Sequence, residues 1–421
     1  MSGLMGKKLL VLGANPETAS LVKKANQMGV RTIVTDYNPD AYAKSFAWKA
    51  LNIDAADVDA LEGVARSLGI AGVCVGVAEA LLPAYCELCQ RLGLPAFSNL
   101  AVFTTLTNKD KFKDLCRKFG VPVPEEYLSD SIPQEAYPVV VKPADACSSK
   151  GISVCYSSEG LGDSLLRARE ASKSRRVIVE KMLDGQEIVM YYAAQQGNAF
   201  PVAMCDRYTW RRSPEAIQLP TAYIFPSLYL PSALEQVDDC VRKMMCGVGI
   251  QNGTIFLQGF ACSDGAIRFY EPGYRLNGAQ EHMILGPITG VDAKEMYIRF
   301  ALTGRVADYD LASLADANIH GKYACKLSPL IRVGKIGRIE GLERISQMEG
   351  VLSVNPSYRP GDEVTGEDTL RQIACRFFII ADTPSELAQR IDEIHQVFRV
   401  VDQEGSDMLV GRFDTSLLER Y

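Results

Sequence analysis

The sequence predicts a mixed α/β and α+β protein, with a parallel sheet near its N-terminus and two further units behind it. In the N-terminal quarter of the chain, short β-rich runs alternate with amphipathic helices, which is typical of βαβ units and a parallel sheet. The chain has 421 residues. That length exceeds one ordinary domain, so two or three domains are expected.

Residues 1–105 are expected to form the N-terminal α/β domain. Its predicted elements are the strand Lys8–Leu12, the helix Glu17–Met28, the strand Arg31–Thr35, the helix Asp57–Leu68, the strand Gly72–Gly76, the helix Leu81–Leu92 and the short strand Pro95–Phe97. Ligands of parallel sheets bind at the carboxyl ends of the strands. We therefore expect the loop residues Gly13, Asp36 and Glu79 at that edge. The glycines after Gly13 do not follow the dinucleotide-binding pattern, which argues against NAD.

Residues 106–303 are expected to form a second domain, which begins with the helix Lys109–Phe119 and contains a small lobe at about residues 122–185. In the lobe we predict the strands Val139–Lys142, Ile152–Tyr156 and Val177–Glu180 and the helix Gly160–Ser172. Larger strands are predicted at Ile188–Gln195, Ala199–Cys205, Thr254–Cys262 and Ala266–Glu271. Residues 304–421 are expected to form a C-terminal α+β module that ends in the helix Ser385–Val397.

Composition excludes several classes of protein. Hydrophobic residues make up 47% and the net charge is -6, which gives no general attraction to nucleic acid. No apolar run is long enough to span a bilayer, and the N-terminus lacks the pattern of a secretory signal. We therefore expect a cytoplasmic protein without membrane contact. Its twelve cysteines are expected to be reduced, with Cys86 and Cys89 as packed thiols.

The segment around Lys142 predicts a binding site for a polyphosphate. An apolar run delivers Lys142 at the end of a strand, and the small-residue loop Asp145–Gly151 follows with Lys150 in it. Fixed positive charge and exposed backbone N–H groups are what a phosphate cradle requires. An unpaired ammonium would also be costly to bury at a strand end, and a phosphate removes that cost. The later strand Val177–Glu180 ends in acidic groups, and the two segments together point to ATP.

The order of these units and motifs resembles the ATP-grasp superfamily, in particular its carboxylate–amine ligases. Those include L-amino acid ligases, phosphoribosylglycinamide synthetases and proteins like the large subunit of carbamoyl phosphate synthase. The resemblance covers essentially the whole chain. It implies an ATP-grasp fold with a pre-ATP-grasp domain, a two-lobed nucleotide clamp and a C-terminal module. The segment from Gly334 to Asp362 has the character of the C-terminal module of amino-acid ligases, and Gly361-Asp362 is read as a structural turn.

The resemblance assigns the nucleotide contacts. Lys109, which stands eleven residues before Gly120, would contact the phosphates, with Lys111 as runner-up. The hinge around adenine would use the carboxylate or carbonyl of Glu180 and the backbone of Lys181 and Leu183. The remaining implied contacts are the apolar cover from Met182 and Leu183, the ribose acid Glu187, the phosphate lysine Lys142 and the covering loop Ser148, Ser149, Lys150 and Gly151.

The metal site departs from the family pattern, which places a carboxylate on one strand and Glu-x-Asn-x-Arg on the next. Glu271 and Arg275 match, but Gly273 stands where the asparagine is expected and Gln258 replaces the first carboxylate. Magnesium accepts amide oxygens but gains no charge from them. We therefore expect Mg²⁺, or Mn²⁺, to bind through Glu271 and Gln258 more weakly than usual, or with help from Asn277.

The resemblance implies an ADP-forming ligase that joins a carboxylate to an amine through an acyl phosphate, with an amino acid among the candidate substrates. Arg275 would stabilise the acyl phosphate, and Lys109 and Lys142 would offset phosphate charge. Candidate substrate contacts are Arg207, Glu79, Asn277 and His282, although His282 fits a packed histidine equally well. Expected partners are small molecules, and a homodimer is left open.

Two alternatives are left open. The first is a phosphoribosylglycinamide synthetase-like or carbamoyl phosphate synthase-like ligase with the same clamp and another acceptor pocket. The second belongs to another class, a nucleotide-binding regulatory protein with weak catalysis. Gln258 and Gly273 favour the second alternative, because both weaken the metal site.

Overall fold

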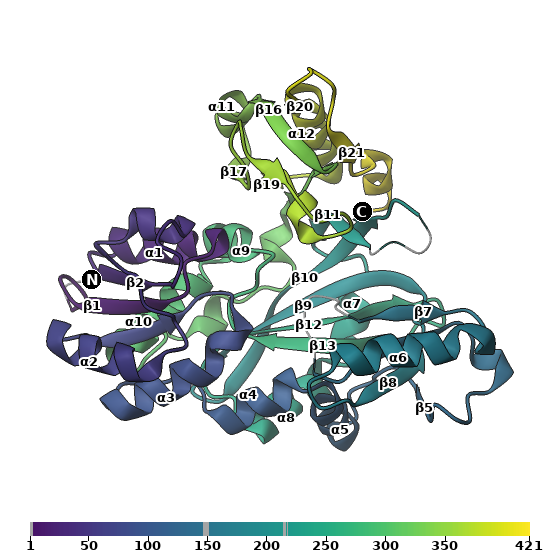
Figure 1. Ribbon diagram of the computed structural model, residues 1–421, viewed down its shortest axis with the longest axis horizontal. Helices are drawn as coiled ribbons and strands as arrows, with labels where there is room; N and C mark the ends of the chain where they lie inside the picture. Colours follow the sequence, from purple (N-terminus) through teal and green to yellow (C-terminus); the bar gives the residue numbers. More distant parts are fainter. Residues whose placement is uncertain (1–2, 146–150, 214–215, 217) are drawn as a thin grey trace.

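The computed structural model describes residues 3–145, 151–213, 216 and 218–421. Three regions are visible in Figure 1: the purple N-terminal unit, the teal central unit and the yellow-green C-terminal module above them. In the described residues, no helix combines the length and the apolar character needed to cross a bilayer.

The N-terminal unit contains a four-stranded parallel sheet in the order β3-β2-β1-β4. Its strands are β1 (Lys8–Leu12), β2 (Arg31–Thr35), β3 (Lys49–Leu51) and β4 (Gly72–Val75). Its helices are α1 (Ala19–Gln27), α2 (Val58–Leu68) and α3 (Leu82–Leu92). The core strands are apolar almost throughout, so both faces of the sheet are buried, as a parallel sheet requires.

The predicted strand Pro95–Phe97 is wrong, because this segment forms no strand. Its backbone is fixed by a side chain instead, since the N–H of Phe97 donates to the hydroxyl of Tyr85 at 3.0 Å. The ring of Phe97 packs edge-on against Tyr274 and Tyr297, at centroid distances of 5.2 and 4.7 Å. The segment thus joins the N-terminal unit to the central one.

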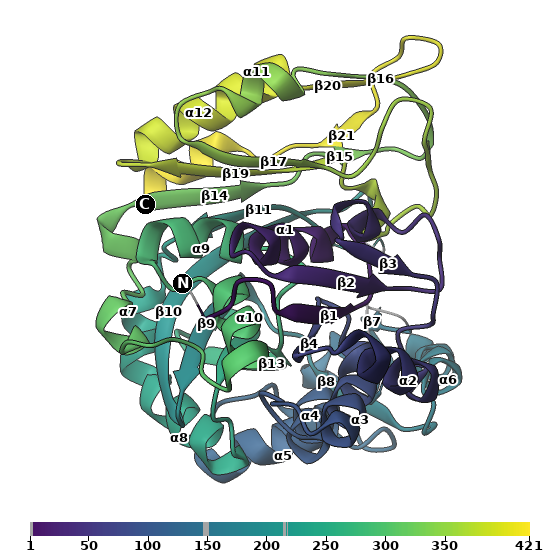
Figure 2. The same cartoon turned by 90° about the vertical axis from the view of Figure 1, so that its left-hand side faces the viewer.

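The helices α9 (His282–Thr289) and α10 (Ala293–Thr303) lie beside the N-terminal sheet, although they follow the central unit in sequence. Figure 2 shows both helices next to α1. A side chain at Gly72 on β4 would clash with the carbonyl of Ala301 on α10, so the strand and the helix backbone approach closely. This packing holds the N-terminal edge in a fixed place relative to the loop that precedes α9.

The small lobe is a four-stranded antiparallel sheet, β5-β8-β6-β7, with one helix. The elements are β5 (Glu126–Tyr127), β6 (Val139–Pro143), β7 (Ser153–Cys155), α6 (Leu161–Ala171) and β8 (Val177–Lys181). Its small core consists of Val139, Val141, Cys155, Ala168 and Val179. The helices α4 (Leu100–Thr107) and α5 (Lys109–Phe119) precede it.

An eight-stranded antiparallel sheet forms the body of the molecule, in the order β13-β12-β9-β10-β11-β14-β19-β17. Its strands are β9 (Gly185–Gln195), β10 (Asn198–Trp210), β11 (Leu219–Phe225), β12 (Gly253–Cys262), β13 (Ile267–Tyr274), β14 (Tyr323–Leu327), β17 (Val351–Pro356) and β19 (Cys375–Ala381). The helices α7 (Leu230–Gln236) and α8 (Asp238–Val248) lie between β11 and β12 in sequence. The sheet continues past residue 304, because β14 pairs with β11.

The C-terminal module adds short elements around the end of this sheet. They are β15 (Leu330–Ile331), β16 (Gly334–Glu340), α11 (Leu342–Ser346), β18 (Glu363–Val364), α12 (Pro384–Val397), β20 (Arg399–Asp402) and β21 (Leu409–Gly411). Thr383 caps α12 by accepting from the N–H of Glu386 at 3.2 Å. The predicted helix is present, but it does not end the module, since β20 and β21 follow it.

Candidate active site

Helix α5 presents two buried lysines on one face. Asn108 caps the helix, with its Oδ1 accepting from the N–H of Lys111 at 3.0 Å. Lys109 and Lys113 lie one turn apart, which places them on the same side of the helix. Lys109 is 8% exposed and Lys113 is fully buried, whereas the runner-up Lys111 is exposed. Of the two phosphate candidates, Lys109 is therefore the one that faces the interior.

Lys113 was not among the predicted site residues, yet it lies at the centre of the site. The carboxylate of Glu180, at the end of β8, is held between the ammonium groups of Lys113 and Lys142. Glu126 on β5 also contacts Lys113, at 2.6 Å. The spacing of Lys109 and Lys113, with apolar Phe112 beside them, was the available signal in the sequence.

The ammonium of Lys142 is paired with Glu180. Lys142 was predicted to need a phosphate because an unpaired ammonium is costly to bury, but the carboxylate of Glu180 already offsets that cost. Burial still lowers the pKa of Lys142, and the charges of Lys113 and Lys109 lower it further, against the opposing effect of Glu180. Positive charge from α5 and from β6 therefore converges here. Because both oxygens of Glu180 are taken, its carbonyl is the better candidate contact for adenine.

The hinge after β8 is tied to the rest of the lobe by its backbone. The N–H of Lys181 donates to the carbonyl of Glu125 at 2.9 Å, and that of Met182 donates to the carbonyl of Pro138 at 3.3 Å. Neither N–H is thus open to an adenine ring in this structure. Met182 and Leu183 are half-buried, so their side chains are the hinge groups suited to apolar cover of a base.

Glu187 and Arg207 face each other across β9 and β10 and form an ion pair. The hydroxyl of Tyr270 donates to Glu187 at 2.6 Å, and the Nε of Arg207 donates to the hydroxyl of Tyr223 at 3.1 Å. Tyr270 is the extra residue of a β-bulge between β12 and β13, which turns its side chain toward β9. The predicted ribose acid and the predicted carboxylate anchor are therefore partners of each other.

The predicted metal residues Gln258 and Glu271 lie opposite each other on β12 and β13. Side chains of directly opposite residues share a face, so both oxygens can serve one cation. Glu271 is also 3.9 Å from the ammonium of Lys109. Within the described residues no group of three or more His, Cys, Asp or Glu side chains could hold a metal. The donors fit magnesium that takes most of its remaining ligands from phosphate and water.

Gly273 has a structural reason for replacing the expected asparagine. A Cβ at this position would clash with the ring of Phe256 on the neighbouring strand. The guanidinium of Arg275 lies over the same ring, 5.4 Å from its centroid. An aromatic platform under Arg275 thus fills the space that an asparagine ligand would need.

Arg275 connects the central sheet to the N-terminal unit. Its Nε donates to Glu79 at 3.3 Å, and its Nη1 donates to the carbonyl of Leu276 at 3.0 Å. Burial raises the pKa of Glu79, the nearby Glu271 raises it further, and Arg275 opposes both. The structure thus brings together Glu79, Glu271 and Arg275. Asn277 is buried, with its Oδ1 bonded to the N–H of Ala279 at 2.9 Å and its Nδ2 without a partner.

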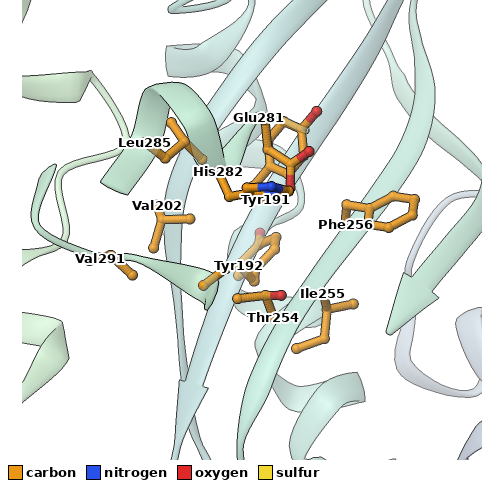
Figure 3. Close-up of a pocket in the computed structure, with 11 residues that line it drawn as sticks. Tyr191, Tyr192, Val202, Thr254, Ile255, Phe256, Glu281, His282, Leu285 and Val291 are labelled. Carbon is orange, nitrogen blue, oxygen red and sulfur yellow. The ribbon is translucent and has the colours of Figure 1, made fainter. Parts of the chain in front are cut away.

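His282 lies in the core, which favours the packed alternative over an open acceptor pocket. Its Nε2 is 3.2 Å from the hydroxyl of Ser20 on α1, and its Nδ1 has no hydrogen-bond partner. Burial and the charge of Lys294 lower its pKa well below the usual range. Figure 3 shows His282 and Glu281 together on the wall of a small cavity.

That cavity has a volume of about 20 Å³ and is also lined by Tyr191 and Phe256. It can hold one water molecule, which needs polar partners. The Oε2 of Glu281 is buried and unpartnered on its wall. Burial raises the pKa of Glu281 to about 8, so this carboxyl is largely protonated at neutral pH.

We expect Glu281→Gln to flatten the pH dependence of stability. The folded-state pKa of Glu281 is about 8 against 4.5 for an ordinary glutamate, so the folded state holds one extra proton between these values. The stability that this proton contributes is present at low pH and is lost as pH rises through about 8. In the wild type this group alone lowers the free energy of unfolding by about 1.4 kcal/mol per pH unit. Denaturant titrations at pH 5 to 8 measure the slope, and equal slopes for both proteins would contradict the assignment.

Three of the predicted loop residues, Ser148, Ser149 and Lys150, lie outside the described residues. Gly151 is described and has φ 75°, a conformation in which glycine is favoured. Asp264 is a turn residue bonded to Arg268 at 2.8 and 2.9 Å. Cys86 and Cys89 are free thiols, and burial raises their pKa values to about 11 and about 12.

A large groove approaches the site from the side of the N-terminal unit. Its volume is about 1070 Å³, and it runs between α1, the segment from Gly278 to Glu295, and the strands β17 and β19. Its walls carry Lys23, Lys24, Lys294, Arg371 and Arg376 together with Glu17, Asp292 and Glu295. A small molecule entering here would reach the loop that follows Arg275.

Two family models match parts of the chain. Residues 88–205 match the C-terminal part of D-alanine–D-alanine ligase, and residues 329–402 match the second C-terminal domain of L-amino acid ligase. The crystal structure of the L-amino acid ligase of Bacillus licheniformis aligns with a TM-score of 0.77 at 18% identity, over 95% of this chain and 99% of that one. The chain has the ATP-grasp fold.

The ATP-grasp assignment is supported by further comparisons. The biotin carboxylase domain of Hydrogenobacter thermophilus 2-oxoglutarate carboxylase, a dimer in complex with MgADP and bicarbonate, aligns with a TM-score of 0.77 at 18% identity, over 96% and 91% of the two chains. The formate-dependent phosphoribosylglycinamide formyltransferase of Synechococcus sp. (strain RCC307) is 27% identical over 47% of this chain. That match spans 52% of the relative, about half its length. Both family models and the Bacillus licheniformis structure are named as ligases.

Proposed function

We propose that the protein is an ATP-dependent ligase that joins a carboxylate to an amine through an acyl phosphate. The observation that carries the proposal is the convergence of the two lobes on one place. Lys109 contacts Glu271 on the large sheet, and its charge acts on Lys142 of the small lobe. Charged groups from both lobes that meet at a carboxylate suited to magnesium fit the phosphate tail of a nucleotide.

In the first step a carboxylate oxygen of the substrate attacks the γ-phosphorus of ATP, and ADP leaves. Lys109 and Lys142 offset negative charge on the transferred group, and Arg275 orients the acid. Magnesium, when bound at Glu271 and Gln258, supplies further charge neutralisation and fixes the phosphate geometry. Glu187 and the hinge at Met182 and Leu183 hold the nucleoside.

In the second step the amine attacks the carbonyl carbon of the acyl phosphate. The C–O bond to phosphate breaks, phosphate departs with one oxygen of the original carboxylate, and the nitrogen loses a proton. Arg275 stabilises the oxyanion that forms on the carbonyl oxygen. The aromatic face of Phe256 keeps Arg275 in place beneath this centre.

The match to an L-amino acid ligase domain over residues 329–402 favours an amino acid as the carboxylate or the amine. A phosphoribosylglycinamide synthetase-like reaction would use the same clamp and stays an alternative, because one relative is named for the formylation of phosphoribosylglycinamide. A nucleotide-binding protein with weak turnover is the second candidate. The replacement of one metal carboxylate by Gln258 favours it.

Trapping with hydroxylamine tests the proposal. Hydroxylamine replaces the amine and converts an acyl phosphate into a stable hydroxamate. We expect the protein, incubated with MgATP, hydroxylamine and pooled amino acids or other carboxylic acids, to form hydroxamate and ADP in equal amounts. Omitting the acids is the control. If the protein binds ADP but forms no hydroxamate from any pool of acids, the weakly catalytic alternative is favoured.

A further inference from the structure

Tyr270 connects three parts of the candidate active site. The bulge in β13 turns its side chain toward β9, across the intervening strand β12, and the three strands lie side by side in Figure 1. Its hydroxyl contacts Glu187 on β9 at 2.6 Å and Gln258 on β12 at 3.3 Å. Its ring centroid lies 5.9 Å from the ammonium of Lys142 in the small lobe. The predicted ribose acid, the predicted metal amide and a predicted phosphate lysine therefore meet at one tyrosine.

The register of β9 and β12 places Glu187 and Gln258 on one face of the sheet. Glu187 is opposite Phe260, and Gln258 lies two residues before Phe260 on β12. Side chains two residues apart on a strand point to the same face. The ring of Tyr270 packs against the ring of Phe260, with the centroids 6.0 Å apart. Packing thus fixes the ring of Tyr270 and brings its hydroxyl to both polar side chains.

The hydroxyl of Tyr270 has one proton for two neighbours. An ionised carboxylate can only accept, so the short contact with Glu187 is a charge-assisted hydrogen bond that uses this proton. The Oε1 of Gln258, at 3.3 Å from the same hydroxyl, then has no proton to accept. A half-turn of the amide exchanges its oxygen and nitrogen, because the two atoms occupy equivalent positions. The Nε2 of Gln258 then donates to the phenol oxygen, and Oε1 is free for another partner.

This arrangement accounts for the amide at position 258, where the family pattern has a carboxylate. A carboxylate there would be a second acceptor for the one phenolic proton and a second negative charge close to Glu187. Like charges at such a distance disfavour each other's ionised forms. An amide avoids both conflicts, because it offers an N–H to Tyr270 and an oxygen to a cation at the same time.

We propose that Tyr270 is a positioning residue that keeps the amide oxygen of Gln258 free for the cation bound by Glu271, while it fixes Glu187. This inference rests on the proposed ligase function and explains how the altered metal site of that function works. Residues that orient a metal ligand through a hydrogen bond typically change metal affinity when they are removed. The effect of Tyr270 on the cation passes through Gln258.

Binding measurements test the inference without turnover. Tyr270→Phe removes the hydroxyl and keeps the ring. In the presence of ADP, we expect this variant to bind Mn²⁺ about tenfold more weakly than the wild type, as followed by electron paramagnetic resonance. Binding of ADP in EDTA, measured by calorimetry, should change much less. An equally large loss in EDTA would mean that the hydroxyl acts on the nucleotide alone, and it would overturn the inference.

A second substitution tests the link between Tyr270 and Gln258. In the Tyr270→Phe background a carboxylate at position 258 no longer competes with Glu187 for a proton. We therefore expect Gln258→Glu to raise Mn²⁺ affinity about tenfold more in that background than in the wild type. The same gain in both backgrounds would show that the two side chains act independently, contrary to the inference.

Tyr274→Phe is the matched control, because Tyr274 lies on the same strand and its hydroxyl contacts the carbonyl of Phe97 at 3.0 Å, toward the N-terminal unit. It should lower the free energy of unfolding and leave Mn²⁺ and ADP affinity unchanged. Equal losses of Mn²⁺ affinity in Tyr274→Phe and Tyr270→Phe would indicate a general loosening of β13 and would overturn the inference. Hydroxamate formation by the wild type, with unaltered Mn²⁺ affinity in Tyr270→Phe, would overturn the inference and leave the ligase function standing. A wild type that binds no ADP, with or without Mn²⁺, would overturn both.

Discussion

Glu271→Gln is expected to lower the rate of ATP turnover by about a hundredfold or more. Glu271 is the one charged carboxylate of the predicted metal pair, since Gln258 opposite it contributes only an amide oxygen. The substitution keeps the size of the side chain and removes the charge that attracts magnesium. Its side chain is 41% exposed, so the fold should tolerate the change. Steady-state ADP release at several Mg²⁺ concentrations measures the effect.

The control for this prediction is Asp264→Asn. Asp264 lies on the turn of the same β12–β13 hairpin and pairs with Arg268 at the surface. Loss of that exposed pair should change neither turnover nor its dependence on Mg²⁺. Equal turnover by Glu271→Gln and the wild type at low Mg²⁺ would contradict the role given to Glu271.

Glu180→Gln is expected to destabilise the fold by about 3 kcal/mol or more. This carboxylate is shared by Lys113 and Lys142, which are 0% and 4% exposed. Without it, Lys142 is buried with no carboxylate, and Lys113 keeps only Glu126. Lys142→Met removes one of the ammonium groups and leaves Glu180 paired with Lys113. It should therefore cost less stability but weaken ATP binding.

Chemical denaturation and nucleotide titration of both variants separate the two effects. Lys111→Met is the control, because Lys111 is exposed on the same helix. A double variant, Lys142→Met with Glu180→Gln, should be more stable than Glu180→Gln alone, since one uncompensated charge is gone. If Glu180→Gln unfolds at the same denaturant concentration as the wild type, the buried cluster contributes no net stability.

The elements that sequence periodicity predicts well are those with strong local patterns. The strand Lys8–Leu12 was predicted with the bounds of β1, and the helix Lys109–Phe119 was predicted with the bounds of α5. Pro95–Phe97 was assigned wrongly because its apolar character serves an aromatic contact with Tyr274 rather than a sheet. The strand β3 was missed, since Lys49-Ala50-Leu51 is short and mostly exposed.

The site was less predictable because its polar groups come from distant parts of the chain. The motif order predicted roles for Lys142, Glu180 and Glu271, but it did not predict the residues that pair with them. Lys113 is one of several lysines in α5, and its complete burial, which the sequence does not show, distinguishes it from the others. No reason for Gly273 was visible in the sequence, because the clash of a side chain there with the ring of Phe256 appears only in the fold.

Transfer of oxygen from the acid to phosphate tests the central claim most directly. The carboxylate oxygen that attacks the γ-phosphorus stays with phosphate when the amine displaces it. Pooled acids labelled with ¹⁸O in their carboxyl groups, incubated with the protein, MgATP and amines, should yield inorganic phosphate that carries one labelled oxygen. Mass spectrometry of the phosphate reads this out. Unlabelled phosphate formed at the same rate as ADP would mean that water attacks ATP, and it would contradict the acyl phosphate.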